Sequence, residues 1–413
     1  MSFKPLLPGS TSASGQQITL GVMGGGQLGR MFVQAAQAMG YFTAVLDPDP
    51  ASPAGLISHF HIQTAYDDEQ GLAQLMQRCE AITTEFENVP APALVTLGAH
   101  RPVAPSAACV AVAQDRIKEK SHFVQCAPIS GVFPAPYAAI TSAELLATVP
   151  ADLLPGILKT ARLGYDGKGQ VRVNNRDELA AAWAQLGQVD CVLEKLMPLR
   201  AECSVIVARG SDGKSVSYPV QANTHHDGIL AITAVHEGAV PGELAERARA
   251  STIAIADHLH YVGVLCVEYF IVDNGQGGQD LIVNEMAPRP HNSGHYTQNA
   301  CDMSQFEAQV RALAGLPLPV PRQHSPAIMV NLLGDLWFSA HAQRAQAGEK
   351  PVSPPWAQVL ALPGTHLHLY GKLSPRPGRK MGHLNITAPT VAQLRDTTAQ
   401  VLALLGLPAL DAA

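Results

Sequence analysis

The sequence predicts a mixed α/β and α+β protein that begins with a doubly wound parallel-sheet domain. The first observation is a short apolar strand over 18–23, which runs into a glycine-rich turn and then an amphipathic helix, as at the start of a βαβ unit. The second is a compact alternation of strands and one helix between 157 and 194. The third is a long carboxyl-terminal half made mostly of β-branched strand segments, which is typical of an α+β arrangement.

Length and composition restrict the class of protein. The chain has 413 residues, enough for two or three domains, and 47% are hydrophobic and 15% charged, which indicates a folded globular protein. Its net charge of −6 argues against nonspecific nucleic-acid binding, and no apolar run is long enough to span a membrane. The 7 cysteines are odd in number and include no CxxC pair, so we expect reduced thiols in a cytoplasmic protein, with neither a disulfide framework nor a zinc site.

The first domain is predicted over 18–127, after a disordered leader over 1–17. Its first strand is followed by a GxGxxG turn and a helix, and its second strand ends at an acidic residue, as in phosphate-binding βαβ units. The strands are Ile18–Met23 and Thr43–Leu46, the glycines are Gly24, Gly26 and Gly29, and the acidic residue is Asp47. Further strands are expected at Ala81–Thr84 and Pro102–Ala104, with one long helix over Ala107–Cys126.

Two more domains are predicted, a small central one over 128–199 and a larger one over 200–413. A proline-rich linker at 128–136 leads into the central domain, and residues 345–357 are expected to form a loop. The expected central elements are the strands Ile157–Thr160, Gln170–Val173 and Cys191–Glu194 and a helix over Asp177–Leu186. The last domain should consist mostly of strands, with helices near 242–258, 303–314 and 391–405.

A β-hairpin at 264–297 carries the most informative chemistry. Its two apolar strands flank a loop rich in Asp, Asn, Gly and Gln, and pairing about a centre between Gln276 and Gly277 places Glu268 opposite Glu285. Both carboxylates then leave the same face, about 5 Å apart. Like charges at that distance are destabilising unless positive charge lies between them, and Mg²⁺ prefers such oxygen ligands. The alternative is two exposed glutamates on a wet face.

The continuation of this hairpin resembles a known family. A carboxylate pair on neighbouring strands, with Asn284 beside the second, is similar to the metal site of the ATP-grasp superfamily. The string from Asn284 to His295, NEMAPRPHNSGH, resembles the ATPase subunits of bacterial-type phosphoribosylaminoimidazole carboxylase, and the similarity extends from about Ile18 to about Leu404. The resemblance implies an ATP-grasp fold with an amino-terminal parallel-sheet domain.

The resemblance also implies an activity in de novo purine biosynthesis. The expected reaction is ATP- and bicarbonate-dependent carboxylation of the 5-amino group of aminoimidazole ribonucleotide by way of carboxyphosphate. ATP and Mg²⁺ are the implied cofactors, with Mn²⁺ as an alternative ion and two metal ions expected. We also expect a cytoplasmic homodimer that binds small-molecule substrates, without nucleic-acid or membrane partners.

Three loops carry the remaining candidates. Lys159 ends an apolar strand before a glycine-rich loop over 161–170, an arrangement that can cover phosphates. A polar loop follows the hairpin and presents many donors beside the metal. A basic loop over 370–383 has proline-restricted positive charges, which suit a phosphate monoester, although a solvated surface loop is the alternative. Its charged residues are Lys372, Arg376, Arg379, Lys380 and His383.

The family resemblance distributes the site residues among four roles. The metal ligands are Glu268 and Glu285, and the substrate ligands are Gln27, Glu85, Lys372, Arg379 and Lys380. The catalytic group is Tyr165, Asp166, Lys168, Arg289, His291, Asn292, Ser293 and His295. The ATP group is Arg116, Lys159, Glu194, Lys195, Leu196, Met197, Glu202, His225, Asn284 and Glu285. Ala161 and Leu163 depart from the family, which commonly has Arg and Gly there.

Several alternatives remain open on sequence alone. The glycine turn with Asp47 predicts NAD binding if it is taken by itself, which would make the chain a redox or sensor protein. The adjacent His225 and His226 suggest a metal cluster, but neighbouring residues on a strand point in opposite directions. Another ATP-grasp ligase, such as a formate-dependent glycinamide ribonucleotide transformylase, is the nearest competing enzyme.

Overall fold

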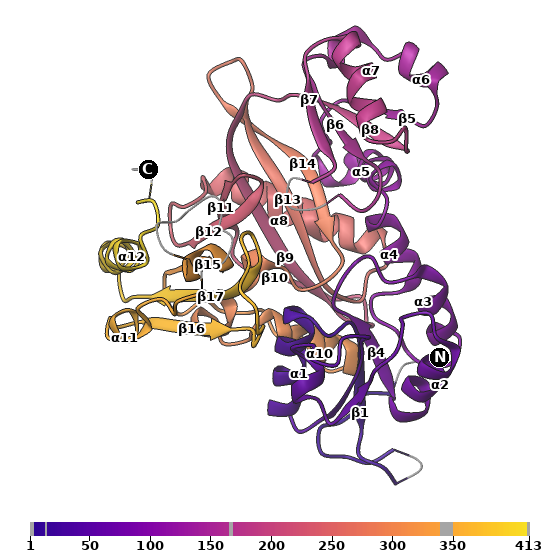
Figure 1. The fold of residues 1–413 in the computed structure, drawn as a ribbon, viewed down its shortest axis with the longest axis vertical. Coiled ribbons are helices and arrows are strands. Elements are labelled where there is room, and N and C mark those ends of the chain that lie inside the picture. The colour runs from indigo at the N-terminus through magenta and orange to yellow at the C-terminus, as the bar shows by residue number, and fades with distance from the viewer. Residues whose placement is uncertain (1–3, 13–14, 165–167, 339–349, 411–413) are drawn as a thin grey trace.

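The computed structural model describes residues 4–12, 15–164, 168–338 and 350–410, and in these the strands form three sheets (Figure 1). The sheets take their strands from 19–84, 137–195 and 199–387 in turn. This arrangement confirms the predicted combination of an amino-terminal parallel sheet with α+β parts, while the domain boundaries stay a prediction. In the described part of the chain, no helix is long and apolar enough to cross a membrane.

The first sheet is entirely parallel, with the order β3-β2-β1-β4. Alternate side chains of β1 point to opposite faces, so Leu20 and Val22 join one apolar cluster and Met23 joins another. Helices cover both faces, which confirms the doubly wound arrangement. The elements are β1 Thr19–Met23, α1 Gln27–Ala38, β2 Phe42–Leu46, β3 Phe60–Ile62, α2 Glu69–Arg78, β4 Ala81–Thr84 and α3 Ala91–Gly98.

A helix from much later in the chain completes the first domain. Helix α10, Gln305–Ala314, packs against α1, and its Val310 and Leu313 belong to the same apolar cluster as Leu20 and Val22. Because this helix also contacts β13 and β9 of the largest sheet, it fixes the first sheet against the rest of the molecule. The glycine turn after β1 is therefore held at a defined place beside the carboxyl-terminal part of the chain.

The sequence prediction was wrong between 102 and 136. Pro102–Ala104 is no strand, because only a single bridge joins Val103 to Ile82. The expected long helix is two helices, α4 Ala107–Ala113 and α5 Arg116–Ser130, since Asp115 caps a new amino terminus by accepting from the amides of Ile117 and Lys118 at 3.1 and 3.4 Å. The proline-rich linker is shorter than predicted, because Pro128 lies inside α5.

The second sheet is small and antiparallel, with the order β5-β8-β6-β7. Lys159 on β6 is paired with Gln170 on β7, so the two predicted strands lie on either side of the glycine-rich segment. Helices α6 and α7 accompany the sheet. The bounds are β5 Tyr137–Ile140, α6 Ala143–Ala147, β6 Gly156–Thr160, β7 Gln170–Val173, α7 Arg176–Gln185 and β8 Cys191–Lys195.

The third sheet follows the order β14-β13-β9-β11-β12-β15-β17-β16, with β10 paired to β9. Its yellow carboxyl-terminal strands lie beside the indigo first domain in Figure 1, and α12 packs on the β15–β17 part. The strands are β9 Leu199–Arg209, β10 Ser215–Ser217, β11 Gln221–His226, β12 Ile229–Val235, β13 Gly263–Asp273, β14 Gln279–Ala287, β15 Ala327–Leu333, β16 Thr365–Leu369 and β17 Lys380–Thr387. The helices are α8 Gly242–His258, α9 Thr297–Ala300, α11 Trp356–Val359 and α12 Val391–Leu405. Helix α11 interrupts the loop that the sequence predicted over 345–357, of which 345–349 lie outside the described residues.

The hairpin of β13 and β14 confirms the predicted pairing of Glu268 with Glu285, but by a different register. Asp273 pairs with Gln279, so the loop is centred on Gln276, half a residue earlier than predicted. A β-bulge at Asn284 then adds one residue to β14 and restores the expected pairing. The bulge therefore brings both carboxylates to the same end of the hairpin.

Candidate functional site

A cleft of about 710 Å³ lies where the three sheets meet. Many of the predicted site residues line it, although they come from all three parts of the chain. They are Gln27, Glu85, Arg116, Lys159, Lys168, Glu202, His225, Glu268, Asn284, Glu285, Arg289, His291, Asn292, His295 and Lys380. Tyr165 and Asp166 lie outside the described residues.

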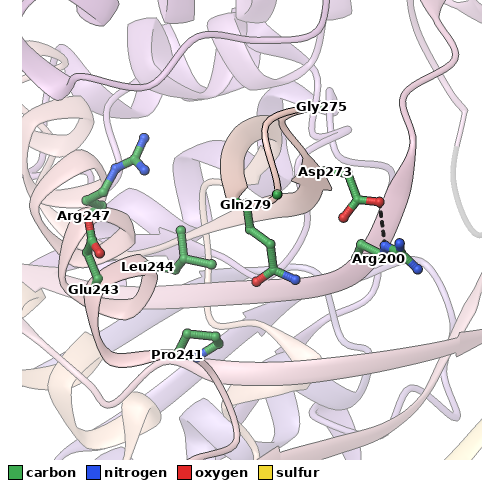
Figure 2. A pocket seen from close by; sticks show the side chains of 10 residues that line it. Arg200, Pro241, Glu243, Leu244, Arg247, Asp273, Gly275 and Gln279 are labelled. Carbon is green, nitrogen blue, oxygen red and sulfur yellow. Dashed lines mark hydrogen bonds and ion pairs between the residues drawn. The ribbon is translucent and has the colours of Figure 1, made fainter.

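A second, more open cavity of about 870 Å³ lies at the tip of the β13–β14 hairpin (Figure 2). Its walls include the ion pair between Arg200 and Asp273, at 2.6 Å, and residues at the start of α8. None of the predicted site residues is among its described lining residues. The smaller cleft is therefore the candidate active site.

A largely buried network of charges supports one wall of the cleft, to which Arg116, Lys159 and Glu285 contribute directly. Arg116, the first residue of α5, lies 2.9 Å from Glu285, while the ammonium groups of Lys120 and Lys159 lie 3.2 and 3.1 Å from one oxygen of Glu194. Lys120 also donates to the backbone oxygen of bulged Asn284 at 2.8 Å. The network thus joins α5 to β6, β8 and β14. The sequence assigned no role to Lys120, because its contacts come from distant strands.

The network shifts the protonation of its members. Burial opposes ionisation of Glu194 and Glu285, but the neighbouring cations, Lys120 for the first and Arg116 for the second, lower the pKa of each to about 2. Burial lowers the pKa of Lys159, which Glu194 partly opposes. Glu119 is different, because burial raises its pKa to about 8. The carboxylates of Glu194 and Glu285 therefore stay ionised at neutral pH.

The end of β8 carries Glu194, Lys195, Leu196 and Met197, which the resemblance assigns to the ATP group. Glu194 is only 3% exposed and does not line the cleft, since its carboxylate pairs with Lys120 and Lys159. The amides of Lys195 and Leu196 donate to the carbonyl oxygens of Pro136 and Pro155, and Met197 accepts from the amide of Leu199. The Glu194 side chain thus positions Lys159, whose own side chain lines the cleft.

The two hairpin carboxylates each have their own cation. Glu268 lies 3.0 Å from the ring of His291, and Glu285 pairs with Arg116. Each of the opposed glutamates therefore has positive charge beside it, and protein groups supply that charge. The carboxylate oxygens of Glu268 and Glu285 suit a hard divalent ion. The buried Oδ1 of Asn284, which lies beside Glu285 in the chain, has no hydrogen-bond partner in the structure. Glu202, His225 and Glu268 also lie within 4.8 Å of one another through their ligand atoms.

The polar loop after β14 is held from behind. His291 lies beside Glu268, and although burial opposes its charged form, the pKa of His291 is raised to about 10 by Cys266 and Glu268. Ser293 is fully buried. Its hydroxyl oxygen lies 2.9 Å from Nδ1 of His291 and 2.8 Å from the hydroxyl oxygen of Ser204, so Ser293 holds the loop in place and does not face the cleft. Asn292 has both side-chain polar atoms buried without a partner.

Two residues that the sequence did not single out fix this loop. Gln305, at the start of α10, bonds the backbone amide and carbonyl of His291 at 2.9 and 2.7 Å and the ring of His295 at 3.2 Å. Glu87 pairs with Arg289 at 2.6 Å, and that guanidinium lowers the pKa of Glu87 against the effect of burial. Glu87 is the second acidic residue of the sequence EFEN, so its position beside Glu85 could have marked it as a candidate. Gln305 has no such signal, because it looks like any residue of an amphipathic helix.

His295 ends a stack of three imidazoles. Its ring lies 4.4 Å from that of His383, which in turn lies 4.5 Å from that of His368. Burial lowers the pKa of His295 and His383 well below the ordinary value and that of His368 to about 4, so all three are neutral at pH 7. The charged His291 and the neutral His295 therefore offer different chemistry in one loop.

The glycine turn is occupied by the protein itself. The amides of Gly26 and Gly29, the latter at 2.6 Å, donate to the Glu85 carboxyl group, so the amino terminus of α1 already has a partner within the protein. Burial raises the pKa of Glu85, an effect that these two amides oppose. A Cβ at Gly26 would collide with that carboxylate. Asp47 accepts from the amide of Gly25 at 2.7 Å and from Tyr66 at 2.6 Å. The backbone amides and the acidic residue that an NAD site would use therefore already form hydrogen bonds within the protein.

The basic loop touches the glycine turn directly. Lys372 donates to the Gln27 side chain at 2.7 Å and to the backbone oxygen of Lys380 at 2.8 Å, and both are neutral acceptors. Arg379 donates to the carbonyl of Ser374 at 2.7 Å. Burial, followed by the charge of Arg379, lowers the pKa of Lys372 to about 8. Bringing an anion to this place would favour the charged form of Lys372.

Family models match successive parts of the chain. A ribonucleotide synthetase preATP-grasp domain matches residues 17–114, an ATP-grasp domain matches 128–306, and a phosphoribosylaminoimidazole carboxylase C-terminal domain matches 327–397. An N5-carboxyaminoimidazole ribonucleotide synthase of Brucella melitensis is 40% identical over 374 residues, which cover 90% of this chain and 96% of the relative.

Solved structures show the same similarity. The N5-carboxyaminoimidazole synthetase of Staphylococcus aureus complexed with ADP has a TM-score of 0.82 and 35% identity, covering 98% of this chain and 99% of that one. The N5-carboxyaminoimidazole synthase of Aspergillus clavatus in complex with ADP and 5-aminoimidazole ribonucleotide has a TM-score of 0.81 and 29% identity, covering 94% and 99%.

The fold and the cleft together define an ATP-grasp enzyme, an ATP-dependent carbon–nitrogen ligase that binds ATP. The chain belongs to the family of N5-carboxyaminoimidazole ribonucleotide synthases. Its reaction is the ATP-dependent carboxylation of aminoimidazole ribonucleotide in purine biosynthesis. The NAD-binding alternative is wrong.

Replacing Glu285 by Gln should affect both turnover and stability. Turnover should fall at least about a hundredfold, the scale of losing an electrostatic group at a phosphate-transfer site. Because Arg116 loses its partner, we expect the metal-free variant to unfold more easily at pH 7, by about 1 kcal/mol or less, since the side chain of Glu285 is 40% exposed. Urea unfolding and steady-state rates measure both effects.

The stability effect of this substitution has a defined pH dependence. The pKa of Glu285 is lowered from 4.5 to about 2, so its stabilising effect is present above pH 4.5 and is lost as the pH falls toward 2. Glu246→Gln, at an exposed position on α8, is the matched control that should change neither property. Normal turnover of Glu285→Gln at saturating Mg²⁺ would contradict the assignment.

Binding of aminoimidazole ribonucleotide should weaken above pH 8. Lys372 loses its proton at about that pH in the free protein, whereas a bound phosphate would hold the proton. Linkage then predicts about tenfold weaker binding at about pH 9 than at about pH 7. Calorimetric titration across this range is the measurement, with Lys372→Arg as the control, because a guanidinium stays charged throughout. A flat profile for the unmodified protein would exclude Lys372 from the phosphate site.

Proposed function

We propose that this chain activates bicarbonate with ATP and transfers the carboxyl group to the 5-amino nitrogen of aminoimidazole ribonucleotide. Bicarbonate attacks the γ-phosphorus, which forms an O–P bond, breaks the bond to ADP and gives carboxyphosphate. Carboxyphosphate then releases CO₂ and phosphate, and the amine captures CO₂ with loss of one proton. The observation that carries the proposal is the polar loop 289–295, which follows the hairpin carboxylates and contacts the same cleft as the basic loop's Lys380.

The phosphates of ATP would bind at the cationic wall. Arg116 and Lys159 both line the cleft, and their partners Glu285 and Glu194 hold them in place before ATP arrives. The phosphates then compete with Glu285 for Arg116 and leave its carboxylate for the metal. Glu268 and Glu285, with Asn284 beside them, would hold Mg²⁺, or Mn²⁺ in its place, and two ions are proposed. The metal neutralises charge on the transferring phosphate.

The ribose and adenine of ATP would lie next to the Glu202–His225 pair. Glu202 lies 3.0 Å from the ring of His225, and both line the cleft. Glu202 raises the pKa of His225 against the effect of burial, so the pair can present both a donor and an acceptor to ribose hydroxyls. The segment Lys195–Met197 would close over adenine through atoms that are not already engaged.

The ribonucleotide would bind between the glycine turn and the basic loop. Lys372, Arg379 and Lys380 would hold its 5′-phosphate, and Gln27 and Glu85 would contact the sugar. The charged His291 and Arg289 suit bicarbonate and developing negative charge, while the neutral His295 can accept a proton near the amine. Tyr165, Asp166 and Lys168 are proposed to cover the reacting groups and exclude water.

We also propose that the enzyme is a homodimer in the cytoplasm. The seven cysteines are all buried and free of disulfides, which supports a reducing compartment. Light scattering on the purified protein tests the dimer directly, since a monomer mass at micromolar concentration would contradict it.

Substrate coupling tests the proposed reaction. ADP release should be strongly stimulated by aminoimidazole ribonucleotide with bicarbonate, and little or not at all by glycinamide ribonucleotide with formate. The reason is that the polar loop and the basic loop form one ribonucleotide site beside the metal carboxylates. A coupled assay of ADP with each substrate pair measures this. Equal stimulation by both pairs would contradict the proposed coupling of ATP cleavage to bicarbonate and aminoimidazole ribonucleotide.

Replacing Arg379 by Ala should separate the two ligand sites. Loss of one charge-assisted contact costs about 1.5–3 kcal/mol, which is roughly 10- to 150-fold in the binding constant of the ribonucleotide. ATP affinity should barely change, because its phosphates are assigned to Arg116 and Lys159. Titration of each ligand separately measures both constants.

Arg395→Ala is the matched control, because this exposed arginine lies on α12 and carries the same charge. It should leave both binding constants unchanged. If Arg379→Ala weakens ATP as much as the ribonucleotide, the basic loop belongs to the ATP site or to the fold, and the proposed map of the cleft is wrong.

A further inference from the structure

Two histidines and a cysteine meet at the contact between α5 and α8. His122 and Cys126 lie one turn apart on α5, and His258 is the last residue of α8. Their nearest ligand atoms all lie within 4.8 Å of one another, and the Sγ of Cys126 is 3.3 Å from Nε2 of His122. None of the three lines the catalytic cleft.

The cluster is arranged as metal ligands are. The imidazole of His122 forms a hydrogen bond to the backbone of Ile255, which fixes the orientation of the ring, as a backbone carbonyl commonly does for a metal-bound histidine. Burial, followed by the nearby His258, lowers the pKa of His122 to about 4, so the ring is neutral and can donate a lone pair. The cluster also lies at the carboxyl end of α8, where the helix dipole favours positive charge.

We propose that His122, Cys126 and His258 form a binding site for a zinc-class divalent cation. Nitrogen and sulfur ligands select borderline and soft ions such as Zn²⁺ over Mg²⁺, which prefers oxygen. Binding replaces the hydrogen bond between Cys126 and His122 with two bonds to the metal, and the thiol proton is released to solvent. His122 and Cys126 are 7% and 1% exposed, whereas His258 is exposed, so the ion enters from the His258 side, where a water molecule completes the fourth position.

The proposed ion would join two helices that serve the catalytic cleft indirectly. Helix α5 begins at Arg116 and also carries Lys120, and it packs against α8 through Phe123, Cys126 and Ile255 in one apolar cluster. A metal bridge further along α5 would therefore stabilise the element that positions the phosphate-facing cations. The site differs from the proposed magnesium site in its nitrogen and sulfur ligands, so the two sites should prefer different ions.

Cobalt provides a direct optical test. Untagged full-length protein, stripped with a chelator and kept reduced, is titrated with Co²⁺ in excess Mg²⁺, so that the cleft carboxylates are already occupied. We expect one equivalent to bind with a near-ultraviolet thiolate-to-cobalt band, and Zn²⁺ to abolish the band and release about one proton per ion. The melting temperature should rise with Zn²⁺ and not with further Mg²⁺.

Substitutions decide whether these three residues are responsible. His258→Ala changes an exposed side chain and should weaken Co²⁺ binding at least about a hundredfold, more than the loss of an outer-sphere partner. Cys126→Ser should remove the charge-transfer band. His100→Ala, at another exposed histidine, is the matched control and should bind as the unmodified protein does. Absence of the thiolate band, or unchanged binding in His258→Ala, would show that the cluster is only a buried hydrogen-bonded contact.

Discussion

The buried ion network around α5 is the constraint on which the rest of the site depends. Three cations from α5 and β6 and two carboxylates from β8 and β14 meet where the second and third sheets converge, so a shift of α5 or of either sheet would leave a charge unpaired. Such a network is weak evidence for stability, because desolvation offsets much of the attraction. The network matters chiefly because it holds Arg116 and Lys159 in the cleft wall before ATP binds.

A similar contact explains why a glycine turn typical of dinucleotide sites is not open to a dinucleotide here. Glu85 reaches from the end of β4 to the amides of Gly26 and Gly29, so the group bound at the start of α1 belongs to the protein. The basic loop then approaches the turn through the contact between Lys372 and Gln27. The proposed phosphate site would therefore take its positive charge from a loop of the last sheet, and it requires the first and third parts of the chain to be assembled.

The sequence predicts most of this fold because its local signals are strong, and it misses features that depend on distant contacts. The pairing of Glu268 with Glu285 was correct, but the bulge at Asn284 that produces it leaves no periodic signal. Asp115 was hidden within an apparently continuous helix. The sequence places Glu194 at the end of a strand, and only the positions of Lys120 and Lys159 show where its side chain is directed. The histidine–cysteine cluster was invisible as well, since His258 lies far along the chain from His122 and no CxxC pair marks it.

The central claim is that the charge network, the hairpin carboxylates and the polar loop together bring bicarbonate to the γ-phosphate of ATP. Oxygen transfer tests it most directly. Reaction in ¹⁸O-labelled bicarbonate with unlabelled ATP and aminoimidazole ribonucleotide should place one labelled oxygen in each phosphate released, measured by mass spectrometry during the first turnovers, because attack on phosphorus leaves that oxygen bound to it. Phosphate that carries only solvent oxygen would show that water attacks ATP and that carboxyphosphate is not formed, which would contradict the account.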